Sequence, residues 1–433
     1  MSESEGKQNP TGVEVKEDAR ETERKAWRNV WLLGGTSFFA DWSSDMTYAL
    51  RAILVKNVLG APASAVGLIE GVADSLASAV KVFSGALSDW LGRRKEPTIA
   101  GYSSSVVGKF IIFVAGRLLS WPVVFVGQVL DRIGKGVRGA PRDALIADGI
   151  PRERRGRAFG IQRTLDHIGA VTGALTCYLI LTQLAIKDEQ LHRVFLYAVL
   201  PGIIGVLLLF FVKEIHKPTK AAPAADAGSV SPAETERPGL YQRWLSLDRR
   251  LRVFLVIVFL FSLANFSNQF MLLKLKDLGY NTPKVVLHYA LYNLLAASLA
   301  YAAGRLSDLL GRKSILVGGY LFYGVVYLGL AFVGKDAWTY VLFGAYGFYL
   351  AMTEGVESAL VSDLAPAHAR ATALGLYGTL VGAGILPASL AAGLLYSWDP
   401  RIPFVLGGAL AAAAGLALWF FLDMKGESPE RKA

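Results

Sequence analysis

The chain has 433 residues, of which 53% are hydrophobic and only 18% are charged. This composition excludes an ordinary soluble protein of several domains and predicts a membrane protein with many spans. The formal net charge of +10 does not indicate a nucleic-acid partner, because the basic residues lie in short segments between apolar runs, and the single cysteine excludes an intramolecular disulfide.

The apolar runs define the predicted architecture. Residues 1–26 are polar and contain no apolar core, so we expect a cytoplasmic tail rather than a signal peptide. From Trp27 onward, apolar runs long enough to span a hydrocarbon core recur about twelve times. We predict an all-α membrane protein with a six-helix bundle at 27–213, a cytoplasmic linker at 214–250, a second six-helix bundle at 251–424 and a tail at 425–433.

The positions of Lys and Arg predict the orientation in the membrane. Basic residues gather in alternate connections, at 93–95, 152–157, 213–220, 312–313 and Arg370. Because short cytoplasmic loops retain positive charge, this pattern places these loops and both ends of the chain in the cytoplasm of an inner-membrane protein. Two segments oppose it, namely 187–193 and the stretch that carries Lys274, Lys276 and Lys284.

Comparison of the chain with itself shows two copies of one unit. The segment GALSDWLGRRK at 85–95 returns as GRLSDLLGRKS at 304–314, and DALIADGIPRERRGRAFG at 143–160 returns as SALVSDLAPAHARATALG at 358–375. The stretch between the copies, 217–239, is rich in Ala, Pro, Ser and charge, as linkers are. Two parallel six-helix halves are typical of secondary transporters, whose substrate site lies near the midplane between the halves.

The chain resembles the major facilitator superfamily over residues 27–424. Its loop at 85–94 is similar to the family signature Gly-x-x-x-Asp-Arg-x-Gly-Arg-Arg, except that Trp90 replaces the usual Arg. RIGKGVRGA at 132–140 is similar to the family's helix 4 motif, with Lys135 and Arg138 replacing a Gln and a Gly. The segments at 41–48 and 134–148 resemble a mostly uncharacterised prokaryotic subgroup, which implies a fold and a class but no substrate.

The repeated signature is predicted to form a gate on the cytoplasmic side. Topology alone would account for its basic residues, but topology does not require an Asp followed by Gly-Arg at one offset in both halves. We expect Asp89 to pair across the bundle interface when the inner side closes, with Asp308 as its weaker counterpart. The predicted gating residues are Gly85, Asp89, Gly92, Arg93, Arg94, Gly304, Asp308, Gly311 and Arg312.

Helix 5 bears on the direction of transport. Drug/proton antiporters of the superfamily carry spaced glycines followed by Gly-Pro in this helix, and the chain has Gly160, Gly169 and Gly173 at that spacing but Ala174 where Pro is expected. This partial resemblance favours export slightly. The same glycines also fit close helix packing, which is the more ordinary role.

Ionisable residues inside the predicted spans are costly, by about 2.5–3.5 kcal/mol each on insertion scales, so each needs a partner, a cavity or a function. The candidates for proton or ion coupling are Asp41, Asp45, Glu70, Asp74, Asp131, Arg132, Asp166 and His167. Glu70 and Asp74 share one helical stripe with Lys81. Asp41, Asp74, Asp131, Arg132, Asp166 and His167 are expected to form one polar cluster near the midplane. Buried structural salt bridges are the alternative reading.

The second half carries mostly neutral hydrogen-bonding groups. The substrate-pocket candidates are Lys135, Arg138, Asn265, Asn268, Gln269, Tyr289, Asn293 and Glu354. The cations of helix 4 would either attract an anionic substrate or hold the acids of helices 1, 2 and 5. We hypothesise that the first half couples ion movement and that the second half shapes the substrate pocket.

Together these features predict a monomeric, proton-coupled secondary transporter that moves a small solute across the bilayer by alternating access. No phosphate-binding glycine loop, metal cluster or positioned nucleophile is apparent, so we expect no ATP-driven pump, no enzyme and no cofactor. Two alternatives stay open. One is a transporter of a metal cation or metal complex, with Asp41, Asp45, Glu70 and Asp74 as oxygen ligands. The other is a membrane sensor or assembly partner that transports nothing.

Overall fold

The computed structural model describes residues 12–91, 93–148, 150–151, 154–215, 247–366 and 370–422. Within these ranges the regular secondary structure is helical. Nine helical segments of the described chain are long and apolar enough to cross a membrane. The spans at α1, α5 and α13 complete the predicted set. α5 crosses with charged residues inside it, and α13 continues into the short helix α14.

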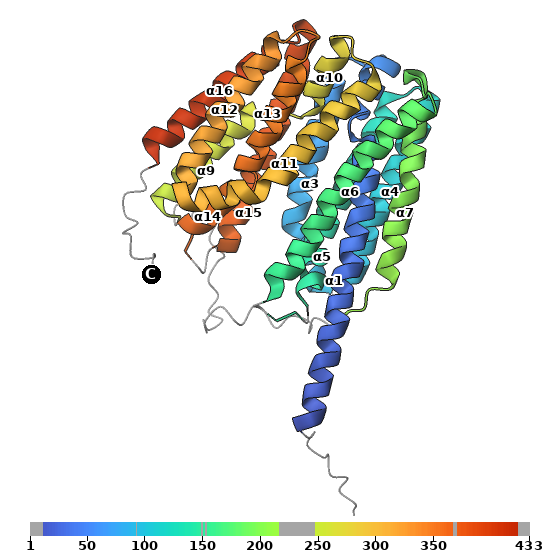
Figure 1. The fold of residues 1–433 in the computed structure, drawn as a ribbon, viewed down its shortest axis with the longest axis vertical. Helices are drawn as coiled ribbons and strands as arrows, with labels where there is room; N and C mark the ends of the chain where they lie inside the picture. Colours follow the sequence, from blue (N-terminus) through green and yellow to red (C-terminus); the bar gives the residue numbers. More distant parts are fainter. Residues whose placement is uncertain are drawn as a thin grey trace, which may run out of the picture.

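The first bundle contains the helices before residue 215. Its long helices are α1 (Gly12–Tyr48), α3 (Ala63–Leu91), α4 (Lys95–Leu118), α5 (Trp121–Ala147), α6 (Arg155–Gln183) and α7 (His192–Phe210). Three short elements, α2 (Arg51–Ile53), η1 (Leu54–Val58) and η3 (Asp188–Gln190), lie in its connections. Helix α1 begins inside the predicted tail and projects beyond the rest of the bundle (Figure 1).

The second bundle repeats this plan. Its helices are α9 (Arg249–Ala264), α10 (Gln269–Asp277), α11 (Thr282–Leu310), α12 (Arg312–Phe332), α13 (Trp338–Thr353), α14 (Val356–Leu364), α15 (Arg370–Trp398) and α16 (Ile402–Phe421). The bundles lie side by side (Figure 1), and they meet where α3 packs on α15 and α6 packs on α11. The predicted pair of six-helix bundles is therefore confirmed.

The spaced glycines of the fifth span, which is α6, serve close packing at two of three positions. A Cβ atom at Gly173 would lie 2.5 Å from the carbonyl oxygen of Trp42, and one at Gly169 would collide with the carbonyl oxygen of Phe38. A Cβ at Gly160 would meet nothing within 4 Å. Because α1 and α6 approach backbone to backbone at the first two sites, only glycine fits there, as the packing interpretation predicted.

Both bundles have a broken first helix. The helix that begins as α1 is interrupted at residues 49–50 before α2, and the helix that begins as α9 is interrupted at 265–268 before α10. The offset of 219 between Gly85 and Gly304 maps Ala49 onto Asn268, so the two breaks are at equivalent positions of the repeat. We call the end of the bundles that carries residues 93–95, 154–157, 213 and 312–313 the basic end. Both breaks lie toward the opposite end, where α2 packs on α10.

Candidate functional site

Two ion pairs join the bundles at the end opposite the basic end. Lys56 in η1 binds the carboxylate of Asp277 in α10 at 2.7 Å, and this carboxylate also accepts a hydrogen bond from the Tyr396 hydroxyl at 2.8 Å. Lys276 in α10 binds Asp188 in η3 at 2.5 Å. The two segments that opposed the expected charge pattern therefore contact each other. The bundles are closed at this end.

Gln269 of α10, in the second bundle, fills the break between α1 and α2 in the first bundle. Its side chain is fully buried, and its amide nitrogen donates to the carbonyl oxygen of Tyr48 at 2.8 Å while its amide oxygen accepts from the backbone nitrogen of Ala52 at 3.2 Å. Because the interrupted helix leaves these backbone groups without helical partners, the amide replaces the missing hydrogen bonds. Gln269, predicted to line the substrate pocket, lines neither of the polar cavities described below.

Near the break in the first bundle, a second contact between the bundles joins a predicted coupling residue to a predicted pocket residue. The Tyr289 hydroxyl of α11 donates a hydrogen bond to the carboxylate of Asp45 in α1. The ring of Tyr289 also stacks on the ring of Tyr48, with centroids 4.9 Å apart. The Arg51 guanidinium lies over the Tyr48 ring, 4.6 Å from its centroid. Asn268, at the break itself, accepts a hydrogen bond from Tyr346 at 2.6 Å.

A network of two acids and two arginines lies inside the first bundle. Arg132 of α5 is 3.0 Å from Asp74 and 3.8 Å from Glu70, and Arg51 of α2 is 3.6 Å from Glu70. Glu70 and Asp74, predicted to share one stripe of the helix that is α3, thus both face Arg132. The Glu70 side chain is 2% exposed and that of Asp74 is 29% exposed, so water reaches Asp74 far more readily.

Asp131 belongs to a separate pair. Lys109 of α4 lies 3.3 Å from the Asp131 carboxylate, and both side chains are nearly fully buried. Neither Lys109 nor Arg51 was predicted from the sequence to be a site residue. Lys109 is the only Lys or Arg within the apolar run at 98–116, and this isolation is the signal by which it could have been found.

The polar cluster predicted near the midplane is divided. Asp166 accepts a hydrogen bond from Gln162 on its own helix at 2.5 Å, Asp41 lines one cavity, and His167 lines another. Neighbouring residues on a helix point about 100° apart, so Asp166 and His167 cannot share one face. Spacing along the chain did not indicate in which direction these side chains point.

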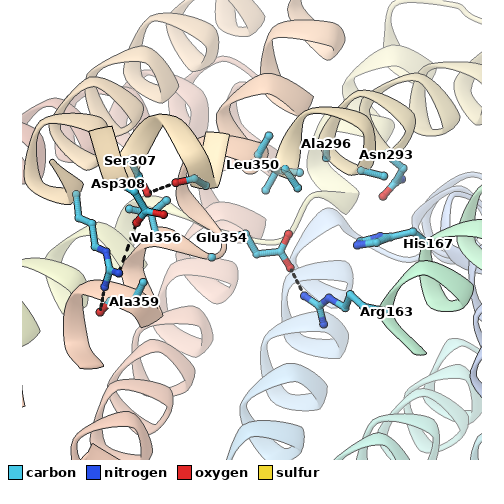
Figure 2. A pocket seen from close by; sticks show the side chains of 16 residues that line it. Arg163, His167, Asn293, Ala296, Ser307, Asp308, Leu350, Glu354, Val356 and Ala359 are labelled. Carbon is cyan, nitrogen blue, oxygen red and sulfur yellow. Dashed lines mark hydrogen bonds and ion pairs between the residues drawn. The ribbon is translucent and has the colours of Figure 1, made fainter. Parts of the chain in front are cut away.

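A cavity of about 580 Å³ lies between α6 of the first bundle and α11, α13 and α14 of the second. We call it the α6–α11 cavity. Figure 2 shows Arg163 and His167 of α6 opposite Glu354, with Asn293 beside His167. Arg163 and Glu354 are 3.7 Å apart and both largely exposed, and they form the one ion pair between the bundles toward the basic end that the described residues show.

A second cavity of about 300 Å³, the α3–α5 cavity, is rich in cations. Its lining residues include Asp41, Lys81, Lys135, Arg138, Arg142 and Asp143. Arg142 pairs with Asp143 at 2.9 Å, and the Arg138 guanidinium bonds Ser105 and lies 4.0 Å from the ring centroid of Tyr102. Within the described ranges, no ion pair involves the ammonium group of Lys81 or of Lys135.

The signature loop ties together the basic end of each bundle separately. Arg94 binds Asp148, at the end of α5, at 2.6 Å, and Arg312 binds Asp363 of α14. Asp148 and Asp363 are matched residues of the repeat, so the same kind of clamp occurs twice. Asp308 is mostly exposed and lies 3.6 Å from Arg312 of its own bundle, and among the described residues no ion pair joins it to the first bundle.

The other gating candidates lie around these clamps. Arg93 pairs with Glu96 at 2.8 Å in an exposed position, and Gly304 lines the α6–α11 cavity. Gly311 ends α11 with a φ of +87°, a conformation that strongly favours glycine. Gly92 and the side chains at Gly85, Asp89 and Trp90 lie outside the described residues.

These features define a secondary transporter with a two-bundle architecture. The two bundles are related by a repeat and have broken helices at equivalent positions. Polar cavities face the basic end, while the opposite end is closed. The family model described as Major Facilitator Superfamily matches residues 31–389 and, in a second match, residues 275–433. The chain therefore belongs to this superfamily and is a multi-pass membrane transporter.

Its curated relatives include proteins of archaea and bacteria. The chain is 36% identical over 406 residues to an uncharacterised MFS-type transporter of Methanocaldococcus jannaschii, covering 92% of this chain and 96% of the relative. It is 25% identical over 393 residues to the multidrug resistance protein MdtH of Cronobacter sakazakii, covering 89% of this chain and 92% of that protein.

Solved structures with the same fold include a nucleoside transporter and a sugar symporter. The nucleoside transporter NupG superposes with a TM-score of 0.69 at 13% identity, covering 90% of this chain and 98% of the other. A D-xylose-proton symporter superposes with a TM-score of 0.68 at 19% identity, covering 92% of this chain and 98% of the other. At these identities the likeness shows the fold alone.

Proposed function

We propose that this protein is a monomeric, proton-coupled secondary transporter of the inner membrane that exports a small solute bearing an anionic group. The basic end faces the cytoplasm in this proposal, because positive charge is retained on that side. With the opposite end closed, the structure then corresponds to the state that takes up solute from the cytoplasm. The observation that carries the proposal is the ion pair between Asp74 and Arg132.

Asp74 is the proposed proton acceptor. Its carboxylate is held by Arg132 at 3.0 Å and is nearly a third exposed, whereas Glu70 is sealed between Arg132 and Arg51. A proton arriving from water neutralises Asp74 and removes one of the two anions that hold Arg132. Glu70 still lies 3.8 Å from Arg132, so the guanidinium is retained within the bundle but is free to change its orientation.

The position of Asp74 connects the proposed proton uptake to the bundle interface. The next residue, Ser75, donates its hydroxyl hydrogen bond to the carbonyl oxygen of Gly382 in α15 at 2.7 Å. Helices α3 and α15 pack along much of their length, and a Cβ at Gly71 would lie 3.1 Å from the carbonyl oxygen of Leu386. Helix α3 therefore carries both the proposed proton acceptor and the surface about which the bundles move.

The cations of the α3–α5 cavity support an anionic solute. Arg138 and Arg142 are held by partners in their own bundle, while Lys81 and Lys135 are available to a ligand. Lysine ammonium groups act as point charges toward carboxylates and phosphates. Export is supported by the multidrug resistance relatives and by the glycine spacing of α6.

The test uses purified protein in liposomes with an imposed pH gradient, after a thermal-stability screen of anionic solutes. We expect solute flux that depends on the gradient and is accompanied by proton movement, recorded with a pH-sensitive dye. Asp74→Asn or Arg132→Ala should abolish the coupled flux while the protein stays folded. Arg117→Ala, an exposed charge at the opposite end, is the matched control. Unchanged flux in both test variants would disprove the assignment.

The metal alternative is weakened by the geometry. The Asp45 carboxylate accepts a hydrogen bond from Tyr289. The carboxylates of Glu70 and Asp74 are paired with arginines and do not converge on a common point where a metal ion could bind. Among the described residues, no group of three or more His, Cys, Asp or Glu side chains is placed to hold a metal ion. Metal-dependent stabilisation that is lost in Asp45→Asn would revive this alternative. Absence of flux under every gradient would favour the sensor.

A further inference from the structure

A crevice with an apolar floor and a basic mouth lies between α9 and α16, outside the transport cavities. It has a volume of about 550 Å³ and is lined by Val253, Val256 and Leu260 of α9 and by Ala417 and Phe421 of α16. Arg249 and Arg252 line it at the start of α9, which is the basic end of the bundle. Val256 is 56% exposed and Phe421 73%, so the crevice opens outward toward the lipid.

Among the described residues, no ion pair neutralises Arg249 or Arg252 at the mouth of this crevice. Residues 248–252 contain Arg249, Arg250 and Arg252 against the single acid Asp248, whose carboxylate accepts from the backbone nitrogen of Arg250 at 2.7 Å. The Nε atom of Arg252 is buried and has no hydrogen-bond partner in the described structure. A buried guanidinium N–H without a partner is costly, so an acceptor beyond the described residues is expected there.

The first bundle has a counterpart at the equivalent place. Its first and last helices, α1 and α7, border a crevice of about 390 Å³ lined by Glu21, Arg24, Lys25, Arg28 and Lys213. Four cations face one acid. Toward the membrane, this crevice is followed by the exposed side chains of Trp31 and Phe211. The same juxtaposition of basic mouth and apolar wall thus occurs in both repeats.

We propose that each bundle binds an anionic phospholipid at its basic end. The phosphate lies on the arginines, Arg249 and Arg252 in the second bundle and Arg24 and Arg28 in the first, and an acyl chain of the lipid fills the apolar crevice between α9 and α16. Guanidinium groups bind phosphate oxygens with paired hydrogen bonds, and basic residues at this depth attract the anionic lipids of the cytoplasmic leaflet. A free phosphate ion would leave the apolar crevice empty, so the observations favour a lipid.

Native mass spectrometry of the detergent-purified full chain tests this proposal with phosphatidylglycerol and phosphatidylcholine as probes. We expect retained phosphatidylglycerol adducts and weak retention of phosphatidylcholine. The pair Arg249→Gln/Arg252→Gln should weaken phosphatidylglycerol binding about tenfold at one site, and Arg24→Gln/Arg28→Gln should do so at the other. The control pair, Arg117→Gln/Arg193→Gln, removes two exposed arginines from the opposite end and should change nothing.

Two further measurements separate lipid from phosphate. Ala417→Trp fills the crevice and leaves both arginines, so it should exclude the lipid from the second bundle. Inorganic phosphate at millimolar concentration should not displace phosphatidylglycerol. Equal retention of the two lipids, full retention in Ala417→Trp, or displacement by inorganic phosphate would each overturn the proposal. Protection of the buried Cys177 thiol from a fluorescent reagent confirms that each variant is folded.

Discussion

The ion pair between Lys56 and Asp277 is expected to hold the bundles together at the end opposite the basic end. Its atoms are 2.7 Å apart and its side chains are about one quarter exposed, so the pair is only partly screened. Pairs of this kind contribute about 1 kcal/mol, and Lys56→Asp adds repulsion of similar size. The closed arrangement should therefore lose about 2 kcal/mol, which is roughly a 30-fold change in the equilibrium between closed and open ends.

Distances between spin labels measure this equilibrium directly. Asn57 and Lys284 are exposed residues on opposite sides of the closed end, and labels can be attached to cysteines there in a Cys177→Ser background. In Lys56→Asp we expect a new population with longer separations. Exchanging the charges with Lys56→Asp/Asp277→Lys should restore the original distance distribution, because the pair is rebuilt in reverse.

A neighbouring lysine provides the control. Lys335 lies at the same end, but it bonds the carbonyl oxygen of Gly279 at 2.7 Å within its own bundle. Lys335→Asp changes the local charge equally without breaking a contact between bundles, so it should leave the distances unchanged. An unchanged distribution in Lys56→Asp, or failure of the exchanged pair to restore it, would refute the argument.

Two further predictions concern packing and the helix break. Gly173→Ala should destabilise the protein by about 1–3 kcal/mol, because the new methyl group meets the backbone of α1. Gly160→Ala should be neutral or stabilising by up to about 1 kcal/mol. Thermal exposure of the Cys177 thiol measures both effects, and equal effects would contradict the packing argument. Gln269→Leu leaves the carbonyl oxygen of Tyr48 without its partner and should destabilise the closed state by about 1–3 kcal/mol. The spin-label distances would report this change as opening. An unchanged distance distribution would show that the amide does not join the bundles.

The architecture could be read from the sequence because it depends on patterns that hold along the whole chain. Apolar runs of spanning length, basic residues in alternate connections and a signature repeated at an offset of 219 predict two bundles without any tertiary information. The stripe that carries Glu70 and Asp74 also follows from helical geometry, and its contact with Arg132 required only that the charges find partners.

The contacts between the bundles could not be read in this way. Lys56 and Asp277 are 221 residues apart, as are Gln269 and Tyr48, and neither pair belongs to a motif or a periodic pattern. The same sequence must also serve every state of the transport cycle, so it does not indicate which end is closed. That choice depends on how two rigid surfaces, α3 on α15 and α6 on α11, pack in one particular state.

The sequence by itself determined which residues are unusually polar for membrane-spanning segments. Only the tertiary structure decided their directions and partners: His167 faces a different cavity from Asp41, Lys109 neutralises Asp131, and Gln269 completes a broken helix instead of lining a pocket. The physical reason is that burial penalises any unpaired polar group, but it does not specify which partner removes the penalty. Packing brings one partner within reach and excludes the rest.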